Sequence, residues 1–235
     1  MQYLGGKSKI SKQICAFLES VRKPNQPFVE PFCGACWITQ GMSGPRYASD
    51  ANEALITMWK AAQSGYEFTE SVSRELYEVY KANQDPRDPL TAFIGFGYSY
   101  SAIWFSNWVD LSNKRNYVGN PKNTISKKLQ KLDGVKFKHS SYIDLPIPNE
   151  PCLIYCDPPY ANQEAYGHVG KFNPFEFFEW AEDLVKLGHT VVISEYIAPR
   201  TWIEVMSMDT ITSLRTKEGC AKRVEKLFMH ESQVK

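Results

Sequence analysis

The tetrapeptide Asp157-Pro158-Pro159-Tyr160 holds the side chains of this sequence that are best suited to chemistry. It follows an apolar run, Cys152 to Cys156, that is typical of a buried strand. An acid at the carboxyl end of such a strand lies where open α/β sheets build their sites. The prolines stiffen the turn, and Tyr160 adds a flat ring. Although a merely stiff turn is the alternative, this combination favours a site for a planar ring with an exocyclic amine, such as adenine or cytosine.

A second candidate segment, Glu30-Pro31-Phe32-Cys33-Gly34, follows a short apolar run that predicts a strand over 27–32. Gly34 would let the backbone approach a ligand closely. We expect a helix from Trp37, whose N-terminus would offer amide donors to an anionic group. The segment therefore reads as a loop that cradles a cofactor.

Asp50 ends the next predicted strand, which covers residues 46–49. An acid in this position usually binds ribose hydroxyls in nucleotide-binding sheets. The alternative is that Asp50 caps the helix predicted over 52–62.

The elements that must position these residues alternate between strand and helix. Helices are predicted over 8–21 and 173–187, and further strands over 135–138 and 190–194. This order predicts an α/β fold with a Rossmann-like sheet that has helices on both faces. Residues 64–131 interrupt it with a helical pattern over 68–82 and an aromatic stretch from Phe93 to Trp108. We expect a catalytic domain from 1–63 and 132–235, with 64–131 as a mainly helical insertion.

Positive charge gathers in and after this insertion, although the net charge of the chain is only +1. Eight basic residues and the single acid Asp133 lie between Leu111 and Lys138; the basic residues are Lys114, Arg115, Lys122, Lys127, Lys128, Lys131, Lys136 and Lys138. A second basic cluster lies over 215–226. Such clusters favour contacts with nucleic-acid phosphates, although a solvated helix face around 126–132 is the alternative. The aromatic residues of the insertion fit either a core or a surface that stacks on bases.

The composition is that of a soluble globular protein, with 43% hydrophobic and 23% charged residues. No apolar run reaches membrane-spanning length, and the N-terminus lacks the pattern of a signal peptide. We therefore expect a cytoplasmic protein without a membrane partner, whose six cysteines are mostly reduced.

The cysteines suggest two further kinds of site, and both are disfavoured. Cys33 and Cys36 have the spacing of a redox dithiol, but the flanking residues fit a cofactor loop better. Cys152 and Cys156 would lie about 13 Å apart on a strand, too far to bind one zinc ion. We expect no metal and treat the histidines as structural.

Four segments, taken in order, resemble the Dam-like, alpha-group adenine-N6 DNA methyltransferases. They are Tyr3-Leu4-Gly5-Gly6-Lys7, Phe28-Val29-Glu30-Pro31-Phe32-Cys33-Gly34, Ser49-Asp50-Ala51-Asn52 and Tyr155-Cys156-Asp157-Pro158-Pro159-Tyr160. The stretch 191–196 is similar to that family as well. The motif matches are spread from residue 3 to about residue 199, which is nearly the whole catalytic domain.

The resemblance implies S-adenosylmethionine as the cofactor. The residues that it implies for cofactor binding are Tyr3, Gly5, Gly6, Lys7, Glu30, Pro31, Phe32, Cys33, Gly34, Asp50 and Asp157. It also implies that Asp157 and the Pro158 carbonyl accept hydrogen bonds from the adenine amine, with Pro159 stiffening the turn and Tyr160 stacking on the ring. One departure is that Ser140 and Ser141 stand where the family often has an acid that contacts the cofactor.

The resemblance further implies a site-specific enzyme that methylates a flipped-out adenine of double-stranded DNA and uses the insertion for target recognition. We expect phosphate contacts from Lys114, Arg115, Lys122, Lys127 and Lys128, and base readout between Tyr98 and Tyr117. It suggests a bacterial or bacteriophage protein, as in restriction-modification systems, and we favour a monomer. The alternatives are transfer to RNA adenine or to a protein amide, or an inactive DNA-binding protein of the same fold.

Overall fold

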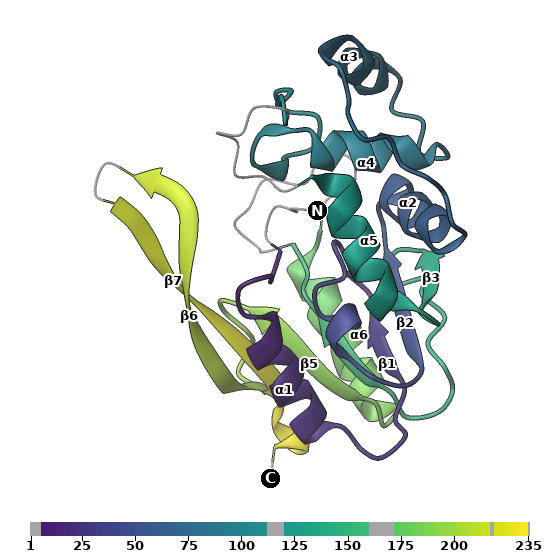
Figure 1. Ribbon diagram of the computed structural model, residues 1–235. Coiled ribbons are helices and arrows are strands. Elements are labelled where there is room, and N and C mark those ends of the chain that lie inside the picture. Colours follow the sequence, from purple (N-terminus) through teal and green to yellow (C-terminus); the bar gives the residue numbers. More distant parts are fainter. Residues whose placement is uncertain (1–5, 112–119, 160–171, 217–218, 235) are drawn as a thin grey trace.

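The computed structural model describes residues 6–111, 120–159, 172–216 and 219–234, with the backbone alone over 210–216 and 219–223. Its described strands form one seven-stranded sheet in the order β3-β2-β1-β4-β5-β7-β6 (Figure 1). The strands are β1 (Phe28–Glu30), β2 (Arg46–Asp50), β3 (Lys136–His139), β4 (Leu153–Cys156), β5 (Thr190–Glu195), β6 (Trp202–Thr216) and β7 (Gly219–His230). The first five are parallel to their neighbours, and β7 is antiparallel to both β5 and β6. The strands β2 and β3 follow on one side of β1, whereas β4 and β5 lie on its other side, so the strand order reverses between β1 and β4.

Helices cover both faces of this sheet. On β1, Phe28 packs with α1 (Ser11–Val21), whereas its neighbour Val29 packs with α6 (Pro174–Lys186). Alternate residues of a strand point to opposite faces, so α1 and α6 lie on opposite sides. The helices α2 (Glu53–Gln63) and α5 (Pro121–Leu132) cover the α1 face over β2 and β3. The predicted Rossmann-like sheet with helices on both faces is thus confirmed.

Burial on both faces explains why β4 is a continuous apolar run and why β5 has one over Val191 to Ile193. Every residue of β4 and β5 is buried, and the run from Leu153 to Cys156 has no outward polar position. Parallel strands covered by helices on both sides characteristically lack an alternating pattern. This is the physical reason why these two strands could be predicted from sequence.

The region 64–131 contributes α3 (Arg74–Asn83), α4 (Pro89–Gly97), the short helix η2 (Tyr100–Ala102) and α5. Its aromatic stretch is mostly core, since Phe93, Phe96 and Phe105 are buried, although Tyr100 is 64% exposed. These rings belong to one hydrophobic core with Trp59 of α2. The insertion therefore packs directly on the sheet-covering helices, and its boundaries as a separate region stay a prediction.

Two predicted helices differ from the observed ones. The helix expected from Trp37 is only the short helix η1 (Thr39–Gly41), because Gly41, Gly44 and Pro45 interrupt any longer helix. A Cβ atom on Gly41 would lie 2.6 Å from the Cys15 sulfur, so the close approach of α1 requires glycine there. The prediction of a longer helix from Trp37, whose N-terminus would offer amide donors, is therefore wrong.

The other difference concerns the start of α3. The predicted helix over 68–82 begins at Arg74, where the Ser73 hydroxyl caps it by accepting a hydrogen bond from the Leu76 amide at 3.2 Å. The chain before Ser73 therefore runs as an irregular connection out of α2.

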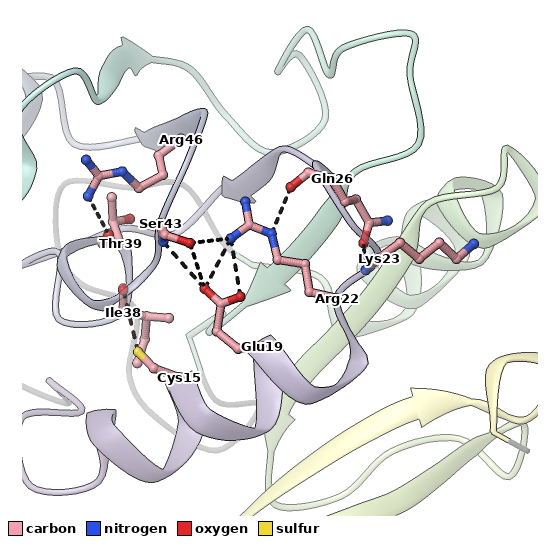
Figure 2. A network of polar contacts seen from close by, with 9 residues as sticks. All are labelled: Cys15, Glu19, Arg22, Lys23, Gln26, Ile38, Thr39, Ser43 and Arg46. Atoms are coloured by element: carbon pink, nitrogen blue, oxygen red, sulfur yellow. Dashed lines mark hydrogen bonds and ion pairs between the residues drawn. The ribbon is translucent and has the colours of Figure 1, made fainter.

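Arg22 fixes the segment that follows α1 against the segment around η1. Its guanidinium donates to the Gln26 carbonyl at 2.8 Å and to Glu19 and Ser43 at 3.1 and 3.3 Å (Figure 2). In the same view, Arg46 donates to the Thr39 carbonyl at 3.3 Å. These contacts fix the segment between β1 and β2. They lie near the amino ends of these strands, opposite to the edge with the strand-end acids.

The strands β6 and β7 form a long antiparallel hairpin that the sequence did not predict. The strand β7 pairs with β5 only from Lys226 to Met229, while its pairing with β6 continues to Thr216 and Gly219. The hairpin therefore projects beyond the sheet as a two-stranded ribbon, on the left in Figure 1. Among the described residues, none of the helices is long and apolar enough to cross a membrane.

Candidate active site

Four acidic side chains gather at the carboxyl edge of the parallel strands. Glu30 ends β1, Asp50 ends β2, Glu195 ends β5 and Asp157 directly follows β4. The strand order reverses between β1 and β4. Open α/β sheets bind their ligands in the crevice at such a topological switch point. The loops after these two strands are therefore the candidate site.

The loop after β1 has an unusual backbone that side chains from other elements hold in place. Gly34 and Cys36 both have left-handed backbone angles, with φ of 45° and 57°. For Cys36 this conformation costs about 1–2 kcal/mol, so surrounding contacts must maintain it. The Trp59 indole of α2 donates to the Gly34 carbonyl at 3.0 Å, and the Lys128 ammonium of α5 donates to the Ala35 carbonyl. Side chains of α2 and α5 thus stabilise the conformation of this loop through its carbonyl groups.

Asp50 ties the same loop to the end of β2. Its Oδ2 accepts a hydrogen bond from the Gly34 amide and its Oδ1 one from the Asn52 amide, both at 2.9 Å. Asn52 caps α2 by accepting from the Leu55 amide at 3.1 Å, so the capping role left open for Asp50 belongs to Asn52. Burial raises the pKa of Asp50, while the two amide donors oppose that rise. A carboxylate has about four acceptor positions, so two amides do not exhaust it.

Glu30 stabilises the segment that follows this loop through hydrogen bonds with Thr39. Its buried carboxylate accepts a hydrogen bond from the Thr39 amide at 2.9 Å and another from the Thr39 hydroxyl. Burial raises the pKa of Glu30 to about 8, although both Thr39 donors lower it. The predicted cofactor residue is therefore placed to hold the segment around η1.

Lys7 brings the N-terminal segment to the acid of the Asp-Pro-Pro turn. Its ammonium lies 2.7 Å from the Asp157 Oδ1 and 3.4 Å from the Glu225 Oε1 of β7. The Ser194 hydroxyl at the end of β5 donates to the same Glu225 oxygen at 2.5 Å. Lys7 is 6% exposed and Asp157 19%, so the pair is largely shielded from water while Asp157 still faces the site. Lys7 is therefore a buried, ion-paired amine and not a solvated surface lysine.

Glu195 is the fourth acid at this edge and is 7% exposed. Its Oε1 accepts a hydrogen bond from the Tyr196 amide at 2.7 Å. Burial raises the pKa of Glu195 to about 7, and the negative charges of Asp157 and Glu225 add to this rise. Close to neutral pH this carboxyl therefore changes its charge.

Aromatic side chains line the α6 side of the same edge. The Phe32 ring lies 5.4 Å from the Tyr142 ring and 5.8 Å from that of Phe177, measured between centroids. Ser141, one of the serines in place of the expected acid, donates to Asp144 at 3.1 Å. Asp144 is exposed, so an acid does lie close to this position in space.

The lysines predicted to contact DNA phosphates have different surroundings. Lys127 is exposed, and Lys122 pairs with Glu70 at 2.5 Å. Lys128 is only 3% exposed, and its ammonium lies 3.5 Å from the centroid of the Trp37 ring. The prediction that Lys128 contacts DNA is therefore wrong, because its charge is already used inside the protein. Burial lowers its pKa to about 8.

The other predicted site residues fall into two groups. Pro31, Cys33 and Pro158 are buried in the two loops, Pro159 is half-buried and Gly6 is exposed beside Lys7. Five residues lie outside the described part of the chain: Tyr3, Gly5, Lys114, Arg115 and Tyr160.

The thiols of the first loop support the interpretation as a cofactor loop. Cys33 and Cys36 are both buried, and burial raises the pKa of the Cys33 thiol well above its usual range. A redox dithiol instead needs an accessible sulfur with a lowered pKa. Within the described ranges no cluster of three or more His, Cys, Asp or Glu side chains could hold a metal ion.

Sequence reasoning missed several supporting residues. Thr39 binds Glu30 from the segment just after the first loop, and Trp59 binds that loop from α2. Glu225 contacts Lys7 from β7, and Ser194 of β5 binds Glu225. No local motif marks such residues. The burial of Lys128, which also supports the loop, was indicated by the sequence, because Lys128 shares the helical spacing of Ile125 and Leu132.

Comparison with known proteins gives consistent matches. The family model of D12 class N6 adenine-specific DNA methyltransferases matches residues 3–89. Relatives named DNA adenine methylase, from Salmonella typhi and Escherichia coli (strain K12), are 24% and 23% identical over 264 residues. Both alignments cover 97% of this chain and 93% of the relative. A solved structure described as a conserved hypothetical protein of Streptococcus pyogenes aligns with 94% of this chain and 96% of its own, at 10% identity and a TM-score of 0.37.

Proposed function

We propose that this chain, a D12 class N6 adenine-specific DNA methyltransferase, takes its methyl group from S-adenosylmethionine and delivers it to an adenine flipped out of duplex DNA. The family match supports adenine methylation of DNA, and methyltransferases of this kind need a methyl donor. The observation that carries the proposal is the Lys7–Asp157 ion pair of 2.7 Å at the switch point of the sheet. It places a fixed carboxylate beside the loop best suited to a cofactor.

The residues after β1 and β2 fit S-adenosylmethionine. The left-handed Gly34 keeps a side chain out of the loop, and Asp50 offers further acceptor positions for ribose hydroxyls. Phe32 and Tyr142 offer aromatic faces for a nucleobase. When bound, the cofactor supplies a methyl group on a positively charged sulfur. The negative edge formed by Asp157 and Glu195 suits that charge.

Asp157 activates the acceptor amine. The N6 lone pair of adenine is delocalised into the ring, which makes the amine a poor nucleophile. A fixed carboxylate and the Pro158 carbonyl would accept its two N–H groups and favour the tetrahedral geometry in which the lone pair can attack. Positive charge then develops on nitrogen, and the Asp157 carboxylate stabilises it. Lys7 keeps that carboxylate oriented and ionised before the substrate arrives.

Access to the amine requires the base to leave the duplex, at a cost of a few kcal/mol. We propose that Tyr160 stacks on the flipped ring and offsets part of this cost. We propose that the exposed Lys127 and the half-buried Lys122 of α5 contact phosphates, together with Lys114 and Arg115, which lie outside the described residues.

The test is methyl transfer from labelled S-adenosylmethionine to unmethylated DNA, with Asp157→Ala beside the wild type. We expect label on the N6 atom of adenine and a loss of at least about a hundredfold in rate for the variant, because positioned acceptors in active sites typically contribute that much. Circular dichroism of both proteins serves as the folding control.

Each outcome has a clear meaning. Label on cytosine, or full activity of the variant, would refute the proposal. Preferential labelling of RNA in a mixed substrate would point to the RNA adenine methyltransferase instead. Cofactor and DNA binding without transfer would indicate an inactive DNA-binding protein.

A further inference from the structure

We infer that Glu225 of β7 is a positioning residue for methyl transfer, which acts through Lys7 on Asp157. The inference rests on the proposed function of Asp157 as the acceptor of the adenine amine. It adds a strand from the opposite end of the chain to the active site.

The geometry places one ammonium between two carboxylates. The Lys7 nitrogen lies 2.7 Å from Asp157 and 3.4 Å from Glu225, and all three side chains are largely buried. Because the two carboxylates belong to different strands, they limit where the ammonium can lie. A lysine on a flexible stem needs such a restraint, since it has three rotatable donors and no fixed shape.

Glu225 is itself held by the sheet. The Ser194 hydroxyl donates to the same Glu225 oxygen that faces Lys7, at 2.5 Å. Ser194 pairs with Leu227 in the ladder between β5 and β7, and Glu225, two residues before Leu227, pairs with Met208 in the ladder between β6 and β7. A rigid support of this kind is what a catalytic group needs to keep its geometry. The order of contacts runs from Ser194 to Glu225, then Lys7, then Asp157.

Electrostatics gives Glu225 a second effect. Burial by itself lowers the pKa of Lys7, but Asp157 and Glu225 more than reverse this, so the pKa is raised. Among the described residues, Glu30 on β1, Tyr155 and Cys156 on β4 and Glu195 on β5 also interact electrostatically with members of this cluster. Glu225 therefore favours the charged form of Lys7, which the ion pair with Asp157 requires.

The hairpin supplies a matched control. Glu204 of β6 pairs with Lys226 of β7 at 2.7 Å, next to Glu225 in the chain, but its side chain is 40% exposed. Exposed pairs of this kind contribute little. Glu204→Gln removes one carboxylate from the same hairpin without touching the Lys7 cluster.

The experiment measures kcat and KM of methyl transfer for Glu225→Gln, Lys7→Met, the double variant and Glu204→Gln. We expect Glu225→Gln to lower kcat about tenfold, with KM for DNA and cofactor within about twofold, because the charge-assisted contact with Lys7 is replaced by a contact with a neutral acceptor that is about half as strong. In the Lys7→Met background the same change should have no further effect, since residues of one network are not additive. Glu204→Gln should match the wild type.

A pH profile separates positioning from a merely structural role. Loss of Glu225 reduces the rise in the Lys7 pKa, so the basic limb of the kcat profile should move to lower pH in Glu225→Gln. If that variant does not fold, Ser194→Ala, which removes the hydroxyl from the same carboxylate, should give a smaller loss of kcat and a shift in the same direction.

Three results would overturn the inference: wild-type kcat in Glu225→Gln, an equal loss in the Lys7→Met background, or an unmoved basic limb. If the wild type transfers no methyl group to DNA, the proposed function fails. The titration of the Lys7 ammonium by NMR then still tests Glu225, because its pKa should fall in Glu225→Gln; an unchanged pKa would contradict the electrostatic part of the inference.

Discussion

Replacing Glu195 by glutamine should stabilise the protein, and the gain should grow with pH. In the folded protein burial raises the pKa of this carboxyl from its ordinary 4.5 to about 7. The folded state therefore binds the Glu195 proton more tightly than the unfolded state does. The resulting stabilisation is complete below pH 4.5 and is lost as the pH rises through about 7. Glutamine cannot ionise and so avoids this loss.

The size of the effect follows from the same values. At about 1.4 kcal/mol for each pKa unit, ionising Glu195 in the folded state costs at most about 3.5 kcal/mol. The Tyr196 amide keeps an acceptor, because the glutamine Oε1 can replace the carboxylate oxygen. We therefore expect the variant to exceed the wild type by about 2–3 kcal/mol in free energy of unfolding at a pH of about 8.5, and by less than about 1 kcal/mol at a pH of about 5.

Urea denaturation of both proteins at the two pH values measures this difference directly. Glu204→Gln is the control, because it removes an exposed carboxylate and should change little at either pH. A difference between Glu195→Gln and the wild type that stays constant with pH, or that falls as the pH rises, would refute the reasoning about the buried carboxyl.

Two further predictions concern residues that hold the loop after β1. Thr39→Val should lower the free energy of unfolding by about 1–3 kcal/mol in urea denaturation, because the buried Glu30 loses a donor, whereas Thr39→Ser should stay close to the wild type; equal stability of the valine variant would contradict this role. Lys127→Ala should weaken DNA binding and reduce its salt slope by about 1 in a titration, since an exposed phosphate contact is lost. Lys128→Met should instead lower the melting temperature and leave the salt slope unchanged, because this ammonium is buried on Trp37 and Ala35; a reduced slope would restore Lys128 as a DNA contact.

The central sheet and its strand-end acids were predictable because their signals are local. The apolar runs within β4 and β5 reflect burial on both faces, Asp50 ends β2 and Asp157 directly follows β4. The fold class, and the placement of these acids at one edge of the sheet, follow from this pattern. The roles of the acids in methyl transfer remain proposals.

Features that depend on distant partners were not predictable. The hairpin β6–β7 carries charged residues such as Glu204 and Lys226 among its apolar ones, and its place in the sheet depends on backbone pairing with β5. The helix expected from Trp37 is short because Gly41, Gly44 and Pro45 interrupt it, and the Cys15 sulfur of α1 leaves little room for a larger residue at Gly41.

Lys128 shows a different cause of error. A lysine in a basic run is ordinarily interpreted as a solvated charge, although Lys128 shares the helical spacing of the buried Ile125 and Leu132. The stripe of buried positions on α5 was visible in the sequence. What the sequence could not indicate is the carbonyl of Ala35, which satisfies the buried ammonium.

The ion pair between Lys7 and Glu225 joins the first residues of the described chain to its last strand. During synthesis the N-terminal segment leaves the ribosome long before β7 exists, so Lys7 must wait for almost the entire chain before this partner appears. Contacts between residues so distant in sequence are slow to form, because the loop that separates them must close first. The active site is therefore expected to be completed late in folding, after the parallel strands have assembled. Nascent chains that have not reached β7 should contain most of the sheet and yet lack a properly supported Asp157.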